Sequence, residues 1–212
     1  MREKEVYVTF IRHGMTAGNQ KKRYIGRTDE PLCEDGEAQI RRQKARGEYP
    51  PKERLGILIA SPMTRCLQTA RLIYPEREPI LDAGLRECDF GLFENKNYLE
   101  MSGFAPYEAW IESNGTLPFP EGETVEGFRE RCCRAARERL LQIWEADVRE
   151  AVFVVHGGTI MSVMERFATL QREYYQWGLE NGGCYRTRLL DPFAGGQRIL
   201  QPVNQKEERV WQ

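Results

Sequence analysis

Short apolar runs occur at three places along the chain, and each ends at a polar cluster. They cover residues 6–11, 55–60 and 151–155 and are rich in Val, Ile, Leu and Phe. Runs of this length, bounded by polar residues, are typical of strands that are buried on both faces of a sheet. The sequence therefore predicts three buried strands, with residues 184–190 and 199–203 as candidate edge strands.

Apolar residues recur at helical spacing in three further stretches. We predict helices over residues 63–74 and 124–144, and a third helix that starts at residues 157–159. Their apolar faces are Met63, Leu67, Ala70 and Tyr74 in the first, Val125, Phe128, Cys132, Ala135 and Ile143 in the second, and Ile160, Val163, Met164 and Phe167 in the third. Strands that alternate with helices of this size indicate an α/β fold, a three-layer sandwich with a mostly parallel central sheet and helices on both faces.

The length of 212 residues is enough for one sizeable hydrophobic core, and we expect a single domain over residues 1–212. Residues 94–120 depart from the pattern because they mix Asn, Gly and Pro with aromatic residues. We interpret this segment as an insertion of short helices that forms a lid or a substrate wall. Its aromatic residues either stack on a base of the substrate or form a small core of the insertion itself. They are Tyr98, Phe104, Tyr107, Trp110 and Phe119.

The chain carries 31 basic and 32 acidic residues, so its formal net charge is -1. This balance provides no field that would favour nucleic acid or an anionic membrane surface. No apolar run is long enough to span a bilayer, and the run that follows the charged N-terminus is too short for a secretory signal. We expect a cytoplasmic protein, a monomer or a homodimer, whose partner is a small molecule and not a nucleic acid or a membrane.

The six cysteines, at positions 33, 66, 88, 132, 133 and 184, show no pair spacing of the kind that binds metal ions. We expect free thiols in a reducing compartment. No other set of metal ligands is apparent, so the sequence predicts neither a metal site nor a cofactor.

The chain contains only two histidines, and each directly follows a predicted strand. His13 is followed by Gly14, and His156 by Gly157 and Gly158. Side chains at the carboxyl ends of parallel strands converge on one crevice, and glycines there let backbone N–H groups approach an anion closely. The helix that begins near Gly157 would add its positive dipole end. A histidine that is merely hydrogen-bonded at a strand end is the alternative, which the repeated context makes the weaker one.

Two arginines are expected at the same edge of the sheet. Arg12 precedes His13, and Arg65 lies on the first turn of the helix that follows the second strand. Either arginine alone would more often be a surface residue. Together with the two imidazoles, however, their planar guanidinium groups form a positive site that suits phosphate oxygens.

At these positions the chain resembles the histidine phosphatase superfamily, in its phosphoglycerate mutase-like branch. That branch includes phosphoglycerate mutases, broad-specificity phosphatases and alpha-ribazole phosphatases. The resemblance covers residues 6 to about 160, in the family's order. Its blocks are residues 12–16 with Asn19, residues 26–32 with Gly36 and Gln39, residues 61–70, 85–87, Phe90-Gly91, Glu94, 122–124 and 156–159.

The resemblance implies a phosphohistidine mechanism. Neutral His13 would attack phosphorus, and water would later hydrolyse the covalent intermediate. Glu87 matches the family's general acid, which protonates the leaving oxygen and then activates water. Without the family, Glu87 would be interpreted as a solvated or ion-paired carboxylate. The implied phosphoryl-binding residues are Arg12, Arg65, a protonated His156, Asn19, Thr16, Gly26 and Gly157.

The implied activity is metal-independent hydrolysis of a small phosphorylated metabolite. Residues 110–120 resemble the alpha-ribazole phosphatases of cobamide biosynthesis, and the short aromatic stretch 97–114 favours a phosphatase over a mutase. The alternative is a phosphoglycerate mutase, which returns the phosphoryl group to the bound product. A non-catalytic phosphate-binding module is the weakest hypothesis, because both His13 and Glu87 are present.

Overall fold

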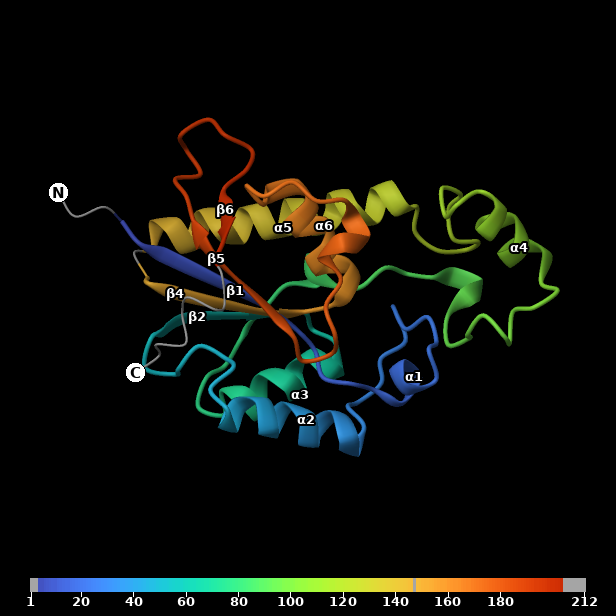
Figure 1. The fold of residues 1–212 in the computed structure, drawn as a ribbon, viewed down its shortest axis with the longest axis horizontal. Coiled ribbons are helices and arrows are strands. Elements are labelled where there is room, and N and C mark those ends of the chain that lie inside the picture. Colours follow the sequence, from blue (N-terminus) through green and yellow to red (C-terminus); the bar gives the residue numbers. More distant parts are fainter. Residues whose placement is uncertain (1–3, 147, 204–212) are drawn as a thin grey trace.

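The computed structural model describes residues 4–146 and 148–203. Its centre is a six-stranded sheet in the order β3-β2-β4-β1-β5-β6 (Figure 1). β1, β4, β2 and β3 run parallel to one another, whereas β5 pairs antiparallel with β1 and β6 pairs antiparallel with β5. The strands are β1 Val6–Arg12, β2 Leu55–Ala60, β3 Ile80–Leu81, β4 Glu150–Val155, β5 Cys184–Leu189 and β6 Leu200–Pro202. The three buried strands that the sequence predicts are confirmed, and strands are present at both predicted edge positions. β6 is an edge strand as predicted, whereas the edge position predicted for β5 is wrong, because β5 pairs with β1 on one side and with β6 on the other.

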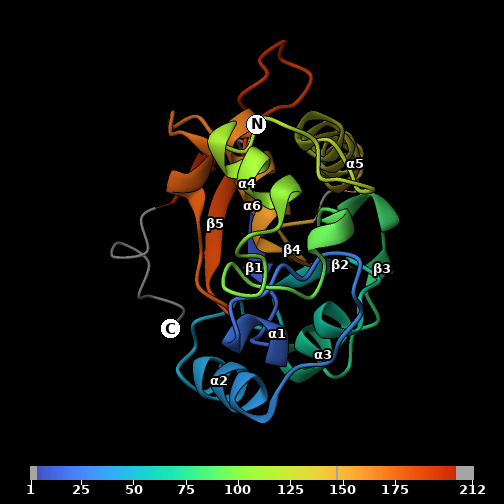
Figure 2. The ribbon, with the colours of Figure 1, turned by 90° about the vertical axis from the view of Figure 1, so that its right-hand side faces the viewer.

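Helices cover both faces of this sheet, with α5 and α6 on one side and α2 and α3 on the other (Figures 1 and 2). This arrangement confirms the predicted three-layer α/β fold. The α-helices are α1 Ala17–Gln20, α2 Glu34–Ala45, α3 Thr64–Ile73, α4 Ala105–Glu112, α5 Val125–Glu145 and α6 Gly157–Phe167. Two short 3₁₀ turns, η1 Ala83–Leu85 and η2 Gly91–Phe93, lie between α3 and α4, and a third, η3 Tyr174–Trp177, follows α6.

Each face of the sheet has its own hydrophobic core. Alternate side chains of a strand point to opposite faces, so Phe10 and Phe153 join the core beneath α5 and α6, while Ile11 and Val154 join the core beneath α2 and α3. The rings of Phe10 and Phe153 stack with their centroids 4.9 Å apart. The two central strands are therefore fixed by apolar packing on both sides.

The helix α2 is absent from the sequence prediction. Only Gly36 and Ile40 of this helix are buried, so its apolar periodicity is too weak to mark a helix. Charge gives the local signal instead. Three acidic residues occupy its first turn, and Arg42 and Lys44 its last, as the helix dipole favours.

The predicted insertion over residues 94–120 contains α4 and a series of turns. Most of its aromatic rings pack on Phe93, which is fully buried, and on Tyr24. The insertion therefore forms a small aromatic core. Of the two alternatives for these residues, the structure supports the core. The rings that form this core are Phe104, Tyr107, Trp110 and Phe119, whereas Tyr98 is exposed.

In the described part of the chain, no helix is long and apolar enough to cross a membrane. All six cysteines lie in this part, and none of them forms a disulfide.

We expect Phe153→Ala to lower the free energy of unfolding by about 3–5 kcal/mol, because it removes a fully buried ring that stacks on Phe10. Urea denaturation followed by circular dichroism measures this loss. Phe193→Ala is the matched control, since that ring is 60% exposed and its removal should change stability by less than about 0.5 kcal/mol. Equal losses in the two variants would contradict the assigned core.

Candidate active site

The candidate site lies where three parallel strands end side by side. His13 directly follows β1, His156 follows β4 and Ser61 follows β2. The sheet ladder continues past the strand ends, because the His13 amide donates to the Val155 carbonyl at 3.0 Å. The two imidazole rings, 143 positions apart in the chain, have their centroids 5.2 Å apart and meet edge to face. The predicted convergence of the histidines is therefore present.

The hydrogen bond of His13 defines its tautomer. Nδ1 lies 2.7 Å from the carbonyl oxygen of Gly14. A carbonyl only accepts, so Nδ1 carries the proton and Nε2 keeps its lone pair. Burial, followed by the charge of Arg65, holds the pKa of His13 well below its usual range, although the bond to Gly14 acts in the opposite direction. His13 is therefore a neutral imidazole at neutral pH.

His156 is fully buried beside polar groups from β2 and α3. Its Nε2 lies 2.7 Å from Oγ of Ser61 and 3.6 Å from Sγ of Cys66. Burial first, and then the charge of Arg65, lower the pKa of His156 well below its usual range. The surroundings of His156 therefore favour the neutral ring, and the protonated form that the resemblance implies requires the negative charge of a phosphoryl group beside it.

Arg65 is completely buried and is held by carbonyl groups. Its Nη1 donates to the Thr28 carbonyl at 2.8 Å and its Nη2 to the Gly26 carbonyl at 2.9 Å. Its Nε is buried and has no hydrogen-bond partner among the described residues. Carbonyl dipoles orient the guanidinium without cancelling its charge, so the positive charge remains for an anion.

Within the described residues, Arg12, like Arg65, is held by a backbone carbonyl and not by a carboxylate. Its Nη1 donates to the Leu179 carbonyl, and its buried Nε also has no partner in the described part of the chain. The guanidinium lies against the first residue of α6, because a Cβ on Gly157 would come within 3.3 Å of Arg12 Nε. Burial lowers the pKa of Arg12, against the charges of Glu87 and Glu180. Arg12 and the N-terminus of α6 thus present positive charge from the same side.

Glu87 reaches this group from the loop after η1. Its Oε2 accepts the Gly158 amide at 2.9 Å and its Oε1 accepts the Cys88 amide at 3.0 Å. Burial raises the pKa of Glu87, although both hydrogen bonds and the two arginines lower it. A Cβ on Gly158 would lie 2.3 Å from Oε1 of Glu87, so a glycine is needed for this approach. A carboxyl group with a raised pKa beside cationic donors is suited to proton transfer.

A large pocket opens from these residues. Its volume is about 1030 Å³, and Arg12, Glu87, Gly157 and Gly158 belong to its lining, whereas His13, Arg65 and His156 do not. Aromatic rings also line the pocket, from the insertion, from the region of η3 and from positions 24 and 90. These rings are Tyr24, Phe90, Trp110, Phe119, Tyr174 and Tyr175. The pocket therefore combines cationic groups with aromatic rings and further charged side chains, including Glu126, Arg129 and Arg166, around a space large enough for a bulky group.

The sequence profile of the histidine phosphatase superfamily (branch 1) matches residues 8–201. The chain belongs to the histidine phosphatase superfamily. The sequence-based assignment of the family is thereby confirmed, and with it the general assignment as a phosphatase.

Three relatives illustrate the range of this histidine phosphatase family. A probable phosphoglycerate mutase GpmB of Enterobacter sp. (strain 638) is 34% identical over 158 residues, which are 71% of this chain and 69% of that protein. A putative phosphoserine phosphatase 2 of Hydrogenobacter thermophilus is 28% identical over 73% of this chain and 74% of its own length. The crystal structure of a putative alpha-ribazole-5'-P phosphatase from Escherichia coli superposes with a TM-score of 0.77 at 22% identity, covering 92% of this chain and 95% of that one.

Among the other residues expected to bind the phosphoryl group, Gly157 begins α6 and Asn19 lies within the short helix α1. Oδ1 of Asn19 accepts from the Thr16 amide at 3.3 Å and from Nδ2 of Asn181 at 3.1 Å. Because Oδ1 faces these donors, Nδ2 is the part of the Asn19 amide that is suited to face a ligand.

Thr16 and Gly26 have structural roles that the sequence did not indicate. Oγ1 of Thr16 caps α1 by accepting the Asn19 amide. The amide of Gly26 donates to Glu94, and its carbonyl accepts from Arg65. Both backbone polar groups of Gly26 are thus used inside the protein, and it acts on the site by holding Arg65.

Glu94 is a supporting residue that the sequence reasoning missed. Its carboxylate accepts the amides of residues 26, 27 and 28, the hydroxyl of Thr28 at 2.7 Å and the Phe90 amide. It therefore fixes the loop whose carbonyls hold Arg65. The sequence showed only its place in a family motif, because the contacts join segments more than 60 positions apart.

We expect the pH dependence of stability to change in the variant Glu87→Gln. The folded state raises the pKa of this carboxyl above its ordinary value of 4.5, so the native state holds the proton more tightly than the unfolded state. The contribution of Glu87 to stability is therefore lost as pH rises through this window. The free energy of unfolding of Glu87→Gln minus that of wild type should therefore be larger at pH 7 than at pH 4. Urea denaturation of both proteins at both pH values measures this difference. A difference that is independent of pH would contradict the raised pKa.

Proposed function

We propose that the protein hydrolyses phosphate monoesters through a covalent phosphohistidine on His13, without a metal ion. The observation that carries this proposal is the bond from Nδ1 of His13 to the Gly14 carbonyl, which leaves the lone pair of Nε2 available in a buried, positively charged site. Nε2 attacks phosphorus while the bond from phosphorus to the leaving oxygen breaks. Water then attacks the phosphohistidine and releases inorganic phosphate and neutral His13.

In this proposal Glu87 handles the proton. Its protonated carboxyl donates to the leaving oxygen, and the resulting carboxylate takes a proton from the attacking water. The raised pKa of Glu87 supports the first role, since the group must hold a proton before the leaving oxygen departs. The amide donors of Gly158 and Cys88 support the second role because they stabilise the carboxylate.

Arg12, Arg65 and His156 bind the equatorial oxygens of the phosphoryl group in the proposed mechanism, with Asn19 and the Gly157 amide as further donors. Fixed cationic donors lower the barrier where charge develops on these oxygens. The described residues contain no group of three His, Cys, Asp or Glu side chains that could hold a metal ion. In the proposal, guanidinium, imidazole and amide groups neutralise the developing charge.

For the substrate we propose a small phosphorylated metabolite with a bulky, aromatic leaving group. The volume of the pocket, about 1030 Å³, and its aromatic walls support this class. Alpha-ribazole 5'-phosphate, an intermediate of cobamide biosynthesis, is the specific candidate, since a structural neighbour carries that name. We further propose that residues 1–212 act as one domain in the cytoplasm, as a monomer or a homodimer.

A phosphoglycerate mutase is the second candidate, because several relatives carry that name. Such a substrate brings a carboxylate besides its phosphate. Arg129 and Arg166 are the pocket cations beyond Arg12, and Arg129 already pairs with Glu165 at 3.2 Å and stacks over the Tyr174 ring. This pairing favours an uncharged leaving group over a carboxylate.

The test is phosphate release in EDTA from p-nitrophenyl phosphate, alpha-ribazole 5'-phosphate and 3-phosphoglycerate, by wild type and His13→Asn. We expect wild type to hydrolyse at least the first two, and the variant to lose about 10³-fold or more in kcat because the nucleophile is gone. Acid quenching of wild type with ³²P-labelled substrate should trap an acid-labile phosphoenzyme. Hydrolysis that survives in His13→Asn would overturn the mechanism, and isomerisation of 3-phosphoglycerate without phosphate release would favour the mutase.

Tyr175→Ala tests the proposed leaving-group class. This ring lines the pocket and is 77% exposed, so its loss removes a stacking surface without opening a core. We expect KM for alpha-ribazole 5'-phosphate to rise about fivefold, and KM for a short alkyl phosphate to stay within about twofold. Phe193→Ala, an exposed ring outside the pocket lining, is the control. A similar rise for both substrates would exclude stacking on the leaving group.

A further inference from the structure

The segment that carries Glu87 has no regular secondary structure. Residues 86–90 lie between the turns η1 and η2 and belong to neither. Peptide groups in such a segment find no partners in a helix or a ladder, so their positions depend on hydrogen bonds from elsewhere in the fold. The direction of the Glu87 side chain is set by whatever holds these peptide groups.

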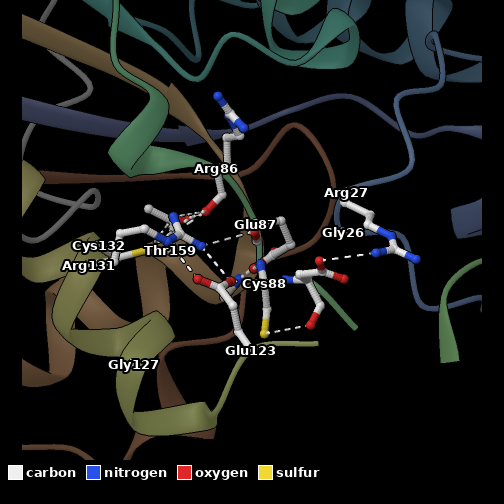
Figure 3. Close-up of polar contacts among 12 residues, drawn as sticks. Gly26, Arg27, Arg86, Glu87, Cys88, Glu123, Gly127, Arg131, Cys132 and Thr159 are labelled. Carbon is white, nitrogen blue, oxygen red and sulfur yellow. Dashed lines mark hydrogen bonds and ion pairs between the residues drawn. The ribbon is translucent and has the colours of Figure 1, made fainter. Parts of the chain in front are cut away.

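Arg131, on α5, supplies several of these hydrogen bonds, and the hydroxyl of Thr159 also donates to the Arg86 carbonyl, at 3.4 Å (Figure 3). Nη1 of Arg131 donates to the carbonyls of Gly84 at 2.9 Å and of Arg86 at 3.1 Å. Its Nη2 donates to the carbonyl of Glu87 itself at 3.3 Å. One guanidinium therefore holds three carbonyls of the chain just before and at the acidic residue.

Glu123 fixes Arg131 from the opposite side. Its two carboxylate oxygens accept hydrogen bonds from Nε of Arg131 at 2.8 Å and from Nη2 of Arg131 at 2.7 Å. This bidentate geometry fixes the orientation of both side chains. The same carboxylate accepts the Asp89 amide at 3.0 Å, and the Asp89 carbonyl accepts the Glu123 amide at 2.9 Å. The segment is thus held on both sides of Glu87.

The charges of this pair neutralise each other. Burial raises the pKa of Glu123, but the bonds from Arg131 and from the Asp89 amide outweigh it and the net shift is downward. Burial lowers the pKa of Arg131, whereas the bond to Glu123 outweighs it and the net shift is upward. Both groups stay ionised at neutral pH, and their mutual neutralisation leaves geometry as their main effect on Glu87.

The carboxyl of Glu87 points away from this pair and meets the amide of Gly158 at the start of α6. Its backbone is therefore fixed to α5 and its carboxyl to α6. We propose that Arg131, held by Glu123, is a positioning residue that places Glu87 for proton transfer to the leaving oxygen. The proposal rests on the proposed function, in which the O–H bond of Glu87 breaks as the bond from phosphorus to the leaving oxygen breaks.

The test compares leaving groups of different basicity in Arg131→Gln. p-Nitrophenolate departs without a proton, whereas an alkoxide requires one, so only the second substrate depends on a well-placed acid. We expect kcat/KM to fall about 100-fold for an alkyl phosphate and less than about threefold for p-nitrophenyl phosphate. A purely structural role of Arg131 would lower both values by the same factor.

Arg139→Gln is the matched control. Arg139 lies about two turns further along α5 and donates through Nε to Asp82 at 2.7 Å, so it also joins α5 to the η1 region. In the part of the chain that the structure describes, Arg139 makes no hydrogen bond to the backbone of residues 86–89, and we expect kcat/KM for both substrates to stay within about twofold of wild type. If Arg139→Gln reproduces the loss that is selective for the alkyl phosphate, the assignment to Arg131 is wrong.

Glu123→Gln serves as a second variant, which keeps the shape of the side chain and covers the case in which Arg131→Gln does not fold. It should show the same selective loss in weaker form, and the double variant should lose no more than Arg131→Gln alone, because Glu123 is proposed to act through Arg131. Additive losses would overturn the shared role.

Hydrogen exchange gives a measure that is independent of activity. The amides of residues 87–89 should exchange at least about tenfold faster in Arg131→Gln, and at the wild-type rate in Arg139→Gln. Unchanged exchange in Arg131→Gln would overturn the positioning role even in an active enzyme. If wild type hydrolyses neither substrate, the proposed function fails by itself, while the exchange rates still show whether Arg131 holds the segment.

Discussion

Everything at the site depends on the parallel pairing of β1, β4 and β2. Because neighbouring parallel strands end at the same edge, residues that are far apart in the chain become neighbours there. The ladder extends beyond the strands, since the amides of His13 and Ser61 donate to the carbonyls of Val155 and Val154. The backbone of the histidine that carries the proposed chemistry is thus part of the sheet and not of a free loop. Apolar packing on both faces, through pairs such as Phe10 and Phe153, keeps this edge in place.

The second constraint is the concentration of positive groups in a buried place. Two guanidinium groups beside two imidazoles are costly unless something compensates for lost water. The protein compensates with carbonyl dipoles, from Gly26 and Thr28 for Arg65 and from Leu179 for Arg12, and it keeps both imidazoles neutral. A carboxylate paired with each arginine would have cancelled the charge that an anion needs. Glu94 acts one step away instead, by binding the backbone of the loop that holds Arg65.

What the sequence could predict follows from what is local. Apolar periodicity marks β1, β2, β4 and the helices α3, α5 and α6, and the position of a polar residue after a strand marks His13 and His156. The sequence did not predict the helix α2, because Ile40 is almost the only buried side chain of this helix. Arg131 lies in a stretch that looks like the polar face of a helix, and only the folded chain brings it to carbonyls 44 to 47 positions away. Contacts of that kind leave no periodic signal, so the supports of Arg65 and Glu87 had to come from the structure.

Glu87 shows why such supports are needed. A carboxyl group whose pKa is raised by burial makes the folded state less stable as pH rises towards neutrality, because ionising it in the native protein is harder than in the unfolded chain. Left on a segment without secondary structure, the group could relieve this penalty by turning towards water. The carbonyl contacts of Arg131 on one side and the amide of Gly158 on the other oppose that movement. The raised pKa of Glu87 and the hydrogen bonds that fix its backbone therefore act together. An acid in water would lack the raised pKa, and a buried acid on a mobile segment would not stay beside the leaving oxygen.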